Sequence, residues 1–102
     1  MSDDGVFRDN PDAKRYELEV EGGVAVMTYN FNPPNMMITE TLVPEALEGR
    51  GLAGRLAAHV VADVQARELV LLPVCPYLSA WLKKHPEHAD VVHPTYRGIL
   101  GI

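Results

Sequence analysis

The sequence predicts a single α+β domain: a mixed sheet, made of an antiparallel β-meander plus one parallel strand, with two helices in the order β-β-β-α-β-α. Two patterns support this prediction. Three strand-like segments separated by turn signals come first, and an amphipathic helical pattern followed by a continuous apolar run comes next. At 102 residues, with 47% hydrophobic and 23% charged residues, the chain has the size and composition of one folded domain.

The meander is predicted over residues 15–43. From 15 to 21, apolar and charged residues alternate, as in a strand with one face on a core and the other in water. Gly22-Gly23 predicts a tight hairpin, and residues 24–31, rich in β-branched and aromatic side chains, predict the antiparallel partner. The turn signal at 32–35 leads into a third strand over 36–43.

The helices and the parallel strand are predicted from residue 52 onwards. Leu52, Leu56, Val60 and Val64 recur every four residues on one stripe, which predicts a helix of roughly four turns. The apolar run 69–72 then predicts a buried strand, parallel to the third one because a strand-helix-strand unit crosses over right-handedly. A second helix is expected over 77–84.

The domain is expected to span residues 14–92. Residues 1–13 are polar and predict a flexible lead-in. Residues 93–102 show no clear period and are expected to form a C-terminal tail, either packed on the core or extended into solvent.

Charge and composition exclude several classes of protein. The net charge of −5, with nine Lys and Arg, argues against a nucleic-acid binder, and no apolar stretch reaches transmembrane length. The only cysteine cannot form an intrachain disulfide, so we expect a reducing, cytoplasmic location. The four histidines lack metal-ligand spacing, and we predict no metal.

The segment with the clearest chemical meaning is the glycine turn from Glu48 to Gly54, between the third strand and the first helix. The first turn of a helix leaves N–H groups without intrahelical partners, which makes it an anion site. Gly49 and Gly51 allow a ligand to approach the backbone closely, and Arg50 can add a cation above a phosphate. From the local residues alone, the glycines could equally serve only to turn the chain into the helix.

Three features of the chain resemble the compact group of GNAT (GCN5-related N-acetyltransferase) proteins. They are the order of the elements, the segment Leu-Val-Pro-Glu-Ala-Leu-Glu-Gly-Arg-Gly-Leu-Ala at 42–53, and Cys75-Pro76-Tyr77 with a later His85-Pro86. The resemblance covers residues 15–92. It implies that acetyl-CoA is the cosubstrate and that backbone amides of 49–54 bind its pyrophosphate. Gly51 and Ala53 match the family pattern Gln/Arg-x-x-Gly-x-Gly/Ala, whereas Glu48 departs from it.

The family also implies that the two parallel strands part, so that the pantetheine arm pairs with the third strand. Pro73 suits such a parting, since it has no N–H with which to continue a ladder. The cofactor-binding residues implied in this way are Leu42, Val43, Glu48, Gly49, Arg50, Gly51, Leu52, Ala53 and Gly54.

Cys75 and Glu40 are the candidate catalytic residues. Cys75 would lie beside a helix N-terminus, a setting that favours the thiolate, although a lone cysteine can also be a buried apolar residue. Glu40 stands in register with Ile38 and Leu42, on one face of a predicted strand, where a carboxylate is costly unless it is paired or functional. A solvent-facing Glu40 remains the alternative. Tyr77 could donate a proton to a departing thiolate, but core packing is its expected role.

The resemblance therefore implies an acetyl-CoA-binding N-acetyltransferase that moves an acetyl group to an unidentified amine, directly or through Cys75. A coenzyme A-binding or sensor module without turnover is the alternative. The acceptor could be a small amine, a peptide or a protein, and the chain a monomer or a weak homodimer.

Overall fold

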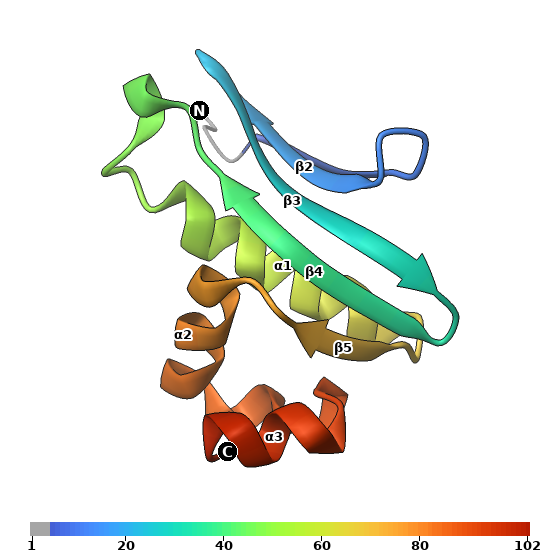
Figure 1. Cartoon of the computed structure of the whole chain (residues 1–102). Helices are drawn as coiled ribbons and strands as arrows, with labels where there is room; N and C mark the ends of the chain where they lie inside the picture. The colour runs from blue at the N-terminus through green and yellow to red at the C-terminus, as the bar shows by residue number, and fades with distance from the viewer. Residues whose placement is uncertain (1–4) are drawn as a thin grey trace.

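The computed structural model describes residues 5–102, and its centre is a five-stranded sheet with the strands in chain order (Figure 1). The first four strands pair antiparallel, and the fifth pairs parallel to the fourth. The strands are β1 (Val6–Asn10), β2 (Arg15–Val20), β3 (Gly23–Asn32), β4 (Asn35–Leu42) and β5 (Val70–Pro73). The predicted α+β fold with a mixed sheet is confirmed.

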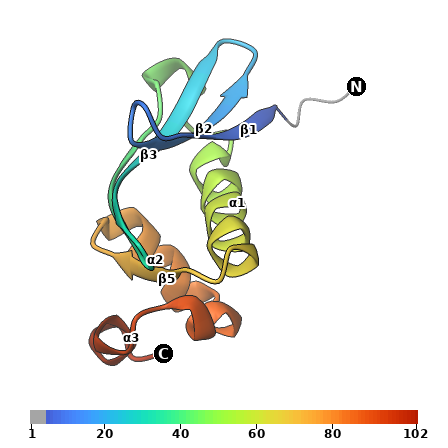
Figure 2. The same cartoon turned by 90° about the vertical axis from the view of Figure 1, so that its right-hand side faces the viewer.

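Helices lie along one face of the sheet and beside its β5 end. The helices are α1 (Leu52–Ala66), α2 (Pro76–Lys84) and α3 (Pro94–Leu100), with 3₁₀ segments over Glu45–Leu47 and Pro86–Val91. Figure 2 shows α1 along one face of the sheet, with α3 on the other side beyond β5. None of the helices within residues 5–102 is long and apolar enough to cross a membrane.

The main core lies between α1 and the sheet. The predicted stripe of α1 is buried there, with Leu56, Val60 and Val64 fully removed from solvent. Burying one such side chain contributes about 1.5–3 kcal/mol, so this stripe anchors the helix. The sheet side of the core is formed by Tyr16, Leu18, Met27, Met36 and Ile38.

The N-terminal end of the chain differs from the expected flexible lead-in, because residues 6–10 of it form β1. The Arg8 guanidinium contacts Glu17 at 2.9 Å and Glu19 at 2.7 Å, and the Phe7 ring stacks on Tyr16 with centroids 5.6 Å apart. These partners lie about ten residues further along the chain, so the local pattern does not reveal them. Residues 1–4 of the expected lead-in lie outside the described residues.

The C-terminal end packs against the domain. The His93 N–H donates to the Leu71 carbonyl at 2.9 Å, and Val92 forms a parallel bridge with Leu71, which covers the outer edge of β5. Tyr96 and Leu100 then pack against the core from α3, a third helix beyond the two predicted. With 7 residues, α3 is too short for a helical period to stand out in the sequence.

Candidate functional site

The parallel strands β4 and β5 part before β4 ends. Their pairing stops where Pro73 lies opposite Ile38, and the Cys75 N–H closes the junction by donating to the Ile38 carbonyl at 2.9 Å. β4 continues to Leu42 without a partner on that side. We call residues 39–42 the open edge of β4. The strand parts at Pro73, the residue that cannot donate to a ladder.

A β-bulge changes the direction of β4 at this point. Tyr29 lies opposite Ile38, but Thr28 lies opposite Glu40, so Thr39 is an extra residue in β4. The bulge shifts the alternation of side chains by one residue. Ile38 is buried in the core before it, whereas Thr41 takes the core-facing position after it, opposite buried Met27.

The bulge also determines which peptide groups are available. The Tyr29 N–H donates to the Lys14 carbonyl, so the Tyr29 peptide group faces β2. Peptide groups alternate in direction along an antiparallel strand, so that of Met27, two residues earlier, also faces β2 and not β4. The pair of Met27 and Thr41 is therefore not hydrogen-bonded. The peptide group of Thr41 consequently faces the side that β5 has left, and is free for an added extended chain.

The turn into α1 leaves further donors unpaired. Gly49 and Gly51 have φ angles of +85° and +74°, in the left-handed region that favours glycine. Gly51 is the N-cap of α1 and has no side chain to cap it, and the first intrahelical bond runs from the Arg55 N–H to the Gly51 carbonyl. The N–H groups of residues 52–54 therefore point out of the helix end without intrahelical partners.

The open edge of β4 and the start of α1 form two walls of one groove, with a volume of about 580 Å³. Its lining residues are Thr41, Leu42, Val43, Leu47, Glu48, Gly49, Gly51, Leu52, Ala53, Gly54 and Tyr77. The structure thus brings together every residue expected to bind the cofactor except Arg50. We refer to this cavity as the groove.

Arg50 lies outside the groove. It lines a neighbouring cavity of about 520 Å³, on the β2 side of the turn, with Glu19, Glu21 and Arg55. Two carboxylates accompany the two guanidinium groups there. The expected cation above a phosphate is therefore not among the residues that line the groove.

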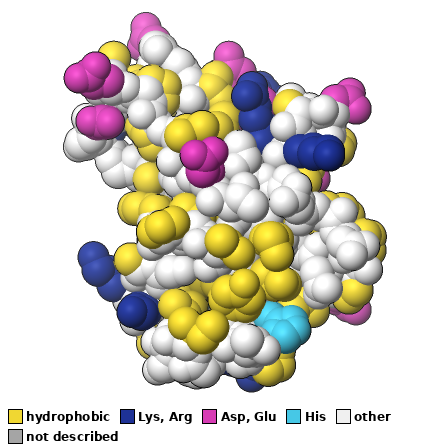
Figure 3. Space-filling view, in the orientation of Figure 1, with side chains coloured by type: hydrophobic (Ala, Val, Ile, Leu, Met, Phe, Trp, Pro, Cys, Tyr) yellow, Lys and Arg dark blue, Asp and Glu magenta, His cyan; other side chains and the backbone are white. Residues whose placement is uncertain are grey.

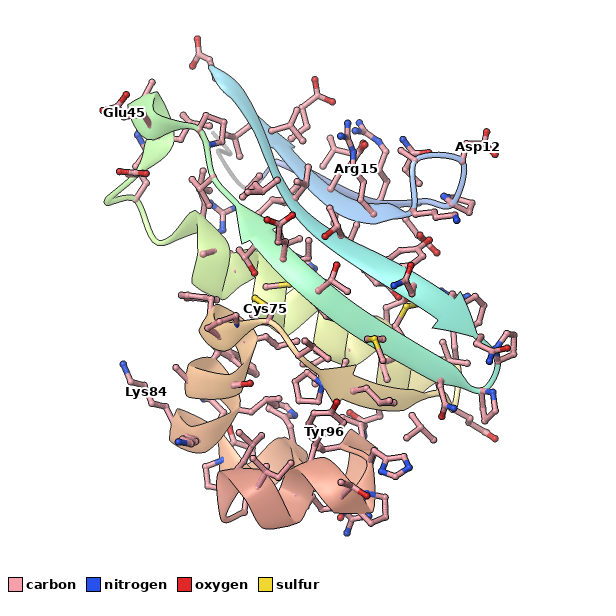
Figure 4. The ribbon with its side chains drawn as sticks, viewed as in Figure 1. Asp12, Arg15, Glu45, Cys75, Lys84 and Tyr96 are labelled. Carbon is pink, nitrogen blue, oxygen red and sulfur yellow. The ribbon has the colours of Figure 1, made fainter. Side chains whose placement is uncertain are left out.

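Cys75 lies at the closed end of the groove, where the strands meet (Figure 4). Its side chain is buried, with 2% exposure, and its sulfur lies 3.0 Å from the Thr41 hydroxyl oxygen. It is also the N-cap of α2. The thiol therefore touches a groove-lining residue but is itself covered.

Glu40 lies on the face of the sheet opposite Ile38, and the expectation that both share one face is wrong. The bulge at Thr39 turns the Glu40 side chain to the outer face, opposite Thr28, where it is exposed. The local alternation of residues predicted the opposite face because a bulge leaves no mark in the apolar pattern. Glu40 and the Cys75 thiol consequently lie on opposite faces of the sheet.

Tyr77 lines the groove, where the sequence did not place it. Core packing was expected for it, but 40% of its surface is exposed and it lines the groove. A helical apolar stripe with Leu78 and Trp81 suggested burial. The sequence signal that could have predicted its place in the groove is its position in the first turn of α2, directly after the strand that parts from β4.

The groups with strongly shifted pKa values lie outside the groove. Burial, together with a hydrogen bond to Asp63, raises the pKa of Tyr16, and burial with a hydrogen bond to Asp9 does so for Tyr29. Arg67 bridges the two carboxylates at 3.1 and 2.9 Å. Asp63 lies nine residues beyond Gly54 along α1, about 13 Å at 1.5 Å per residue. This network therefore stabilises the far end of the sheet.

Within residues 5–102, no group of three or more His, Cys, Asp or Glu side chains is placed to hold a metal ion.

A mixed sheet whose parallel strands part beside a glycine turn defines an α+β domain of the acetyltransferase type. The sequence profile of the GCN5-related N-acetyltransferases matches residues 15–91, and the chain belongs to this family. The solution structure of a GCN5-like protein from Staphylococcus aureus is similar over 91% of each chain, with a TM-score of 0.67. At 23% identity this likeness concerns the fold. No curated protein matches the sequence.

Proposed function

We propose that the chain binds acetyl-CoA in the groove and transfers its acetyl group to an amine. The observation that supports this most strongly is that two kinds of unpaired backbone donor line one cavity. N–H groups at the start of α1 suit a diphosphate, and the Thr41 peptide group on the open edge suits the amides of a pantetheine arm. The family to which the chain belongs supports the same ligand.

Transfer requires an amine nitrogen to attack the thioester carbonyl. The carbon–sulfur bond then breaks, the amine loses a proton, and the coenzyme thiolate gains one. With the arm along the open edge, the thioester would lie toward the closed end, near Thr41 and Cys75. We favour direct transfer, because a relay would require the Cys75 thiol, only 2% exposed, to reach the carbonyl.

Glu40 is the proposed base for direct transfer. It lies on the outer face beside the bulge, and an amine approaching the open edge from that side would meet its exposed carboxylate. The carboxylate could remove the proton through a water molecule.

Titration calorimetry with coenzyme A and acetyl-CoA tests the binding step. We expect one site per chain with both ligands. Absence of heat at millimolar coenzyme A would contradict the proposal. Gly98→Ala serves as a folded control, because Gly98 lies in α3 with open space around the added methyl group.

Intact-mass spectrometry and thiol release test the transfer step. Incubation with acetyl-CoA should leave Cys75 without an adduct, and Cys75→Ala should retain thiol release with an accepted amine. Glu40→Gln should lower that turnover. A single acetyl adduct on the parent that is lost in Cys75→Ala would instead establish the relay.

A coenzyme A-binding module without turnover, acting as a partner subunit, is a second candidate, because exposed apolar side chains on the outer face suit contact with another protein. Among the described residues, Leu42 at the mouth of the groove remains 50% exposed and Val74 45%. Figure 3 shows hydrophobic side chains gathered over the middle and lower parts of this face. Coenzyme A binding without thiol release across small amines, peptides and basic proteins would select this candidate.

A further inference from the structure

We propose that Tyr77 is a ligand-binding residue of the groove, and that its ring and hydroxyl contact the pantetheine arm of coenzyme A. This inference rests on the proposed function and assigns a third wall to the same site. The first two walls, the open edge of β4 and the turn into α1, consist largely of backbone groups. Tyr77 adds a side chain from α2 that can make both apolar and polar contacts.

The position of Tyr77 follows from its approach to Gly54. A methyl group added at Gly54 would lie 3.4 Å from the Tyr77 hydroxyl, so the phenol reaches across from α2 to the first turn of α1. Because Gly54 has no side chain, the Tyr77 hydroxyl has space beside the first turn of α1. Tyr77 lines the groove from this side, while Thr41, Leu42 and Val43 line it from β4.

The Tyr77 hydroxyl has no protein partner among the described residues. Trp81, one helical turn further along α2, directs its indole nitrogen to the same place, 3.9 Å from a methyl group at Gly54, and likewise makes no hydrogen bond there. Among the described residues that are not exposed, no buried side-chain nitrogen or oxygen lacks a partner, so the unpaired Trp81 nitrogen is accessible, and Tyr77 itself is 40% exposed. Two unpaired polar groups thus converge beside the groove.

The chemistry of the lining favours the pantetheine arm over the diphosphate. The apolar residues that line the groove with Tyr77 include Leu42, Leu47 and Leu52. This lining with the phenol ring suits the dimethyl-substituted carbon of the arm, and a hydroxyl that can donate and accept suits its amide and hydroxyl groups. The diphosphate has its own donors at the start of α1. An arm that pairs with Thr41 has to pass between the open edge and Tyr77.

The test compares two ligands on matched variants by titration calorimetry. The ligands are coenzyme A and adenosine 3′-phosphate 5′-diphosphate, which is coenzyme A without its arm. We expect Tyr77→Ala to weaken coenzyme A binding about tenfold, the loss typical of a well-packed contact, and to change nucleotide binding less than about twofold. Lys84→Ala, at the other end of α2 and exposed, is the control and should change neither (Figure 4).

Trp81 supplies a second measurement because it is the only tryptophan in the chain. In the parent, coenzyme A should change its fluorescence, whereas the nucleotide without the arm should not. This readout does not depend on the stability of a Tyr77 variant.

The outcomes separate this inference from the proposed function. Unchanged coenzyme A binding by a folded Tyr77→Ala chain would overturn the role of Tyr77 and leave the groove as the site. Equal weakening of both ligands, or equal fluorescence changes with both, would overturn the assignment to the arm. No binding of coenzyme A by the parent would overturn the proposed function and this inference together.

Discussion

Gly51 determines the geometry of the helix start that faces the groove. Its φ of +74° is costly for any residue with a Cβ atom, and no neighbouring atom lies within 4 Å of an added methyl group. Its conformation, and not the space around it, therefore requires glycine. The same conformation leaves the N–H groups of residues 52–54 directed at the groove.

Gly51→Ala should lower the free energy of unfolding by about 1 kcal/mol, since the left-handed conformation penalises alanine. Coenzyme A affinity should fall as well, because the turn presents the amides. Chemical denaturation and calorimetry measure the two effects. Gly98→Ala is the matched control: Gly98 lies inside α3 with no such φ angle, and alanine should stabilise the chain by about 0.5–1 kcal/mol. Equal effects of the two substitutions would contradict this account.

Glu17 shows how a charged residue can be buried on a sheet face. Only 5% of it is exposed, and its carboxylate accepts hydrogen bonds from Arg15 at 2.7 Å, Asn10 at 3.0 Å and Arg8 at 2.9 Å. These donors, Arg15 foremost, lower the pKa of Glu17 to about 2. The ionised carboxylate therefore joins β1 to β2.

This pKa shift predicts an acid-sensitive contribution to stability. Glu17 titrates near 4.5 when unfolded, so its contribution is complete above about pH 4.5 and is lost as the pH falls toward 2. Glu17→Gln should consequently flatten the pH dependence of unfolding between pH 4.5 and 2. Denaturation at several pH values measures this. Glu21→Gln, on an exposed residue without an ion pair in the described structure, should leave the profile as in the parent. Identical profiles for all three proteins would contradict the assignment.

At the scale of elements, the bulge in β4 and the early end of β5 act together. The end of β5 at Pro73 leaves one side of β4 unpaired, and the extra residue Thr39 decides that the Thr41 peptide group faces that side. The early end of β5 leaves the edge open, and the bulge sets which residue presents its peptide group there. Together they form an edge to which an extended ligand can add.

Amide hydrogen exchange can test this arrangement directly. The Thr41 N–H should exchange rapidly in the free chain, and coenzyme A should slow it by about tenfold or more, because an added ligand strand would pair with it. The Glu40 N–H, which faces β3, should be protected in both states and is the internal control. Thr41 protection in the free chain, or none with ligand bound, would contradict the proposed pairing.

At the scale of the whole molecule, both chain ends complete the sheet. β1 forms one outer strand, while residues 92–93 cover the outer edge of β5 and α3 packs beside them. An uncovered strand edge is a site of unwanted pairing between chains. The C-terminal segment therefore protects the edge nearest the groove.

Two neighbouring residues of α3 measure how strongly this segment is held. Leu100 packs against the core, whereas Ile99 is 69% exposed. Leu100→Ala should lower the free energy of unfolding by about 1–2 kcal/mol, and Ile99→Ala should change it by less than about 0.5 kcal/mol. Denaturant unfolding measures both. Equal effects would mean that α3 does not pack as described.

The fold was predictable from the sequence because its signals are local. The stripe of Leu56, Val60 and Val64 and the alternation over 15–21 indicate their elements within a few residues. β1 was not predictable, since Arg8 and Phe7 are stabilised by residues on other elements. The same holds for Tyr77, whose exposure depends on where α2 meets α1.

The sequence by itself therefore determined the class of fold and the glycine turn, since helical and strand periods and the conformational freedom of Gly51 are properties of short segments. Only the tertiary structure decided which faces Glu40 and Thr41 occupy, that Arg50 lies outside the groove, and that Tyr77 lines it. These positions depend on strand register, on a bulge and on the packing of one helix against another, and such long-range contacts leave no periodic signal in the chain.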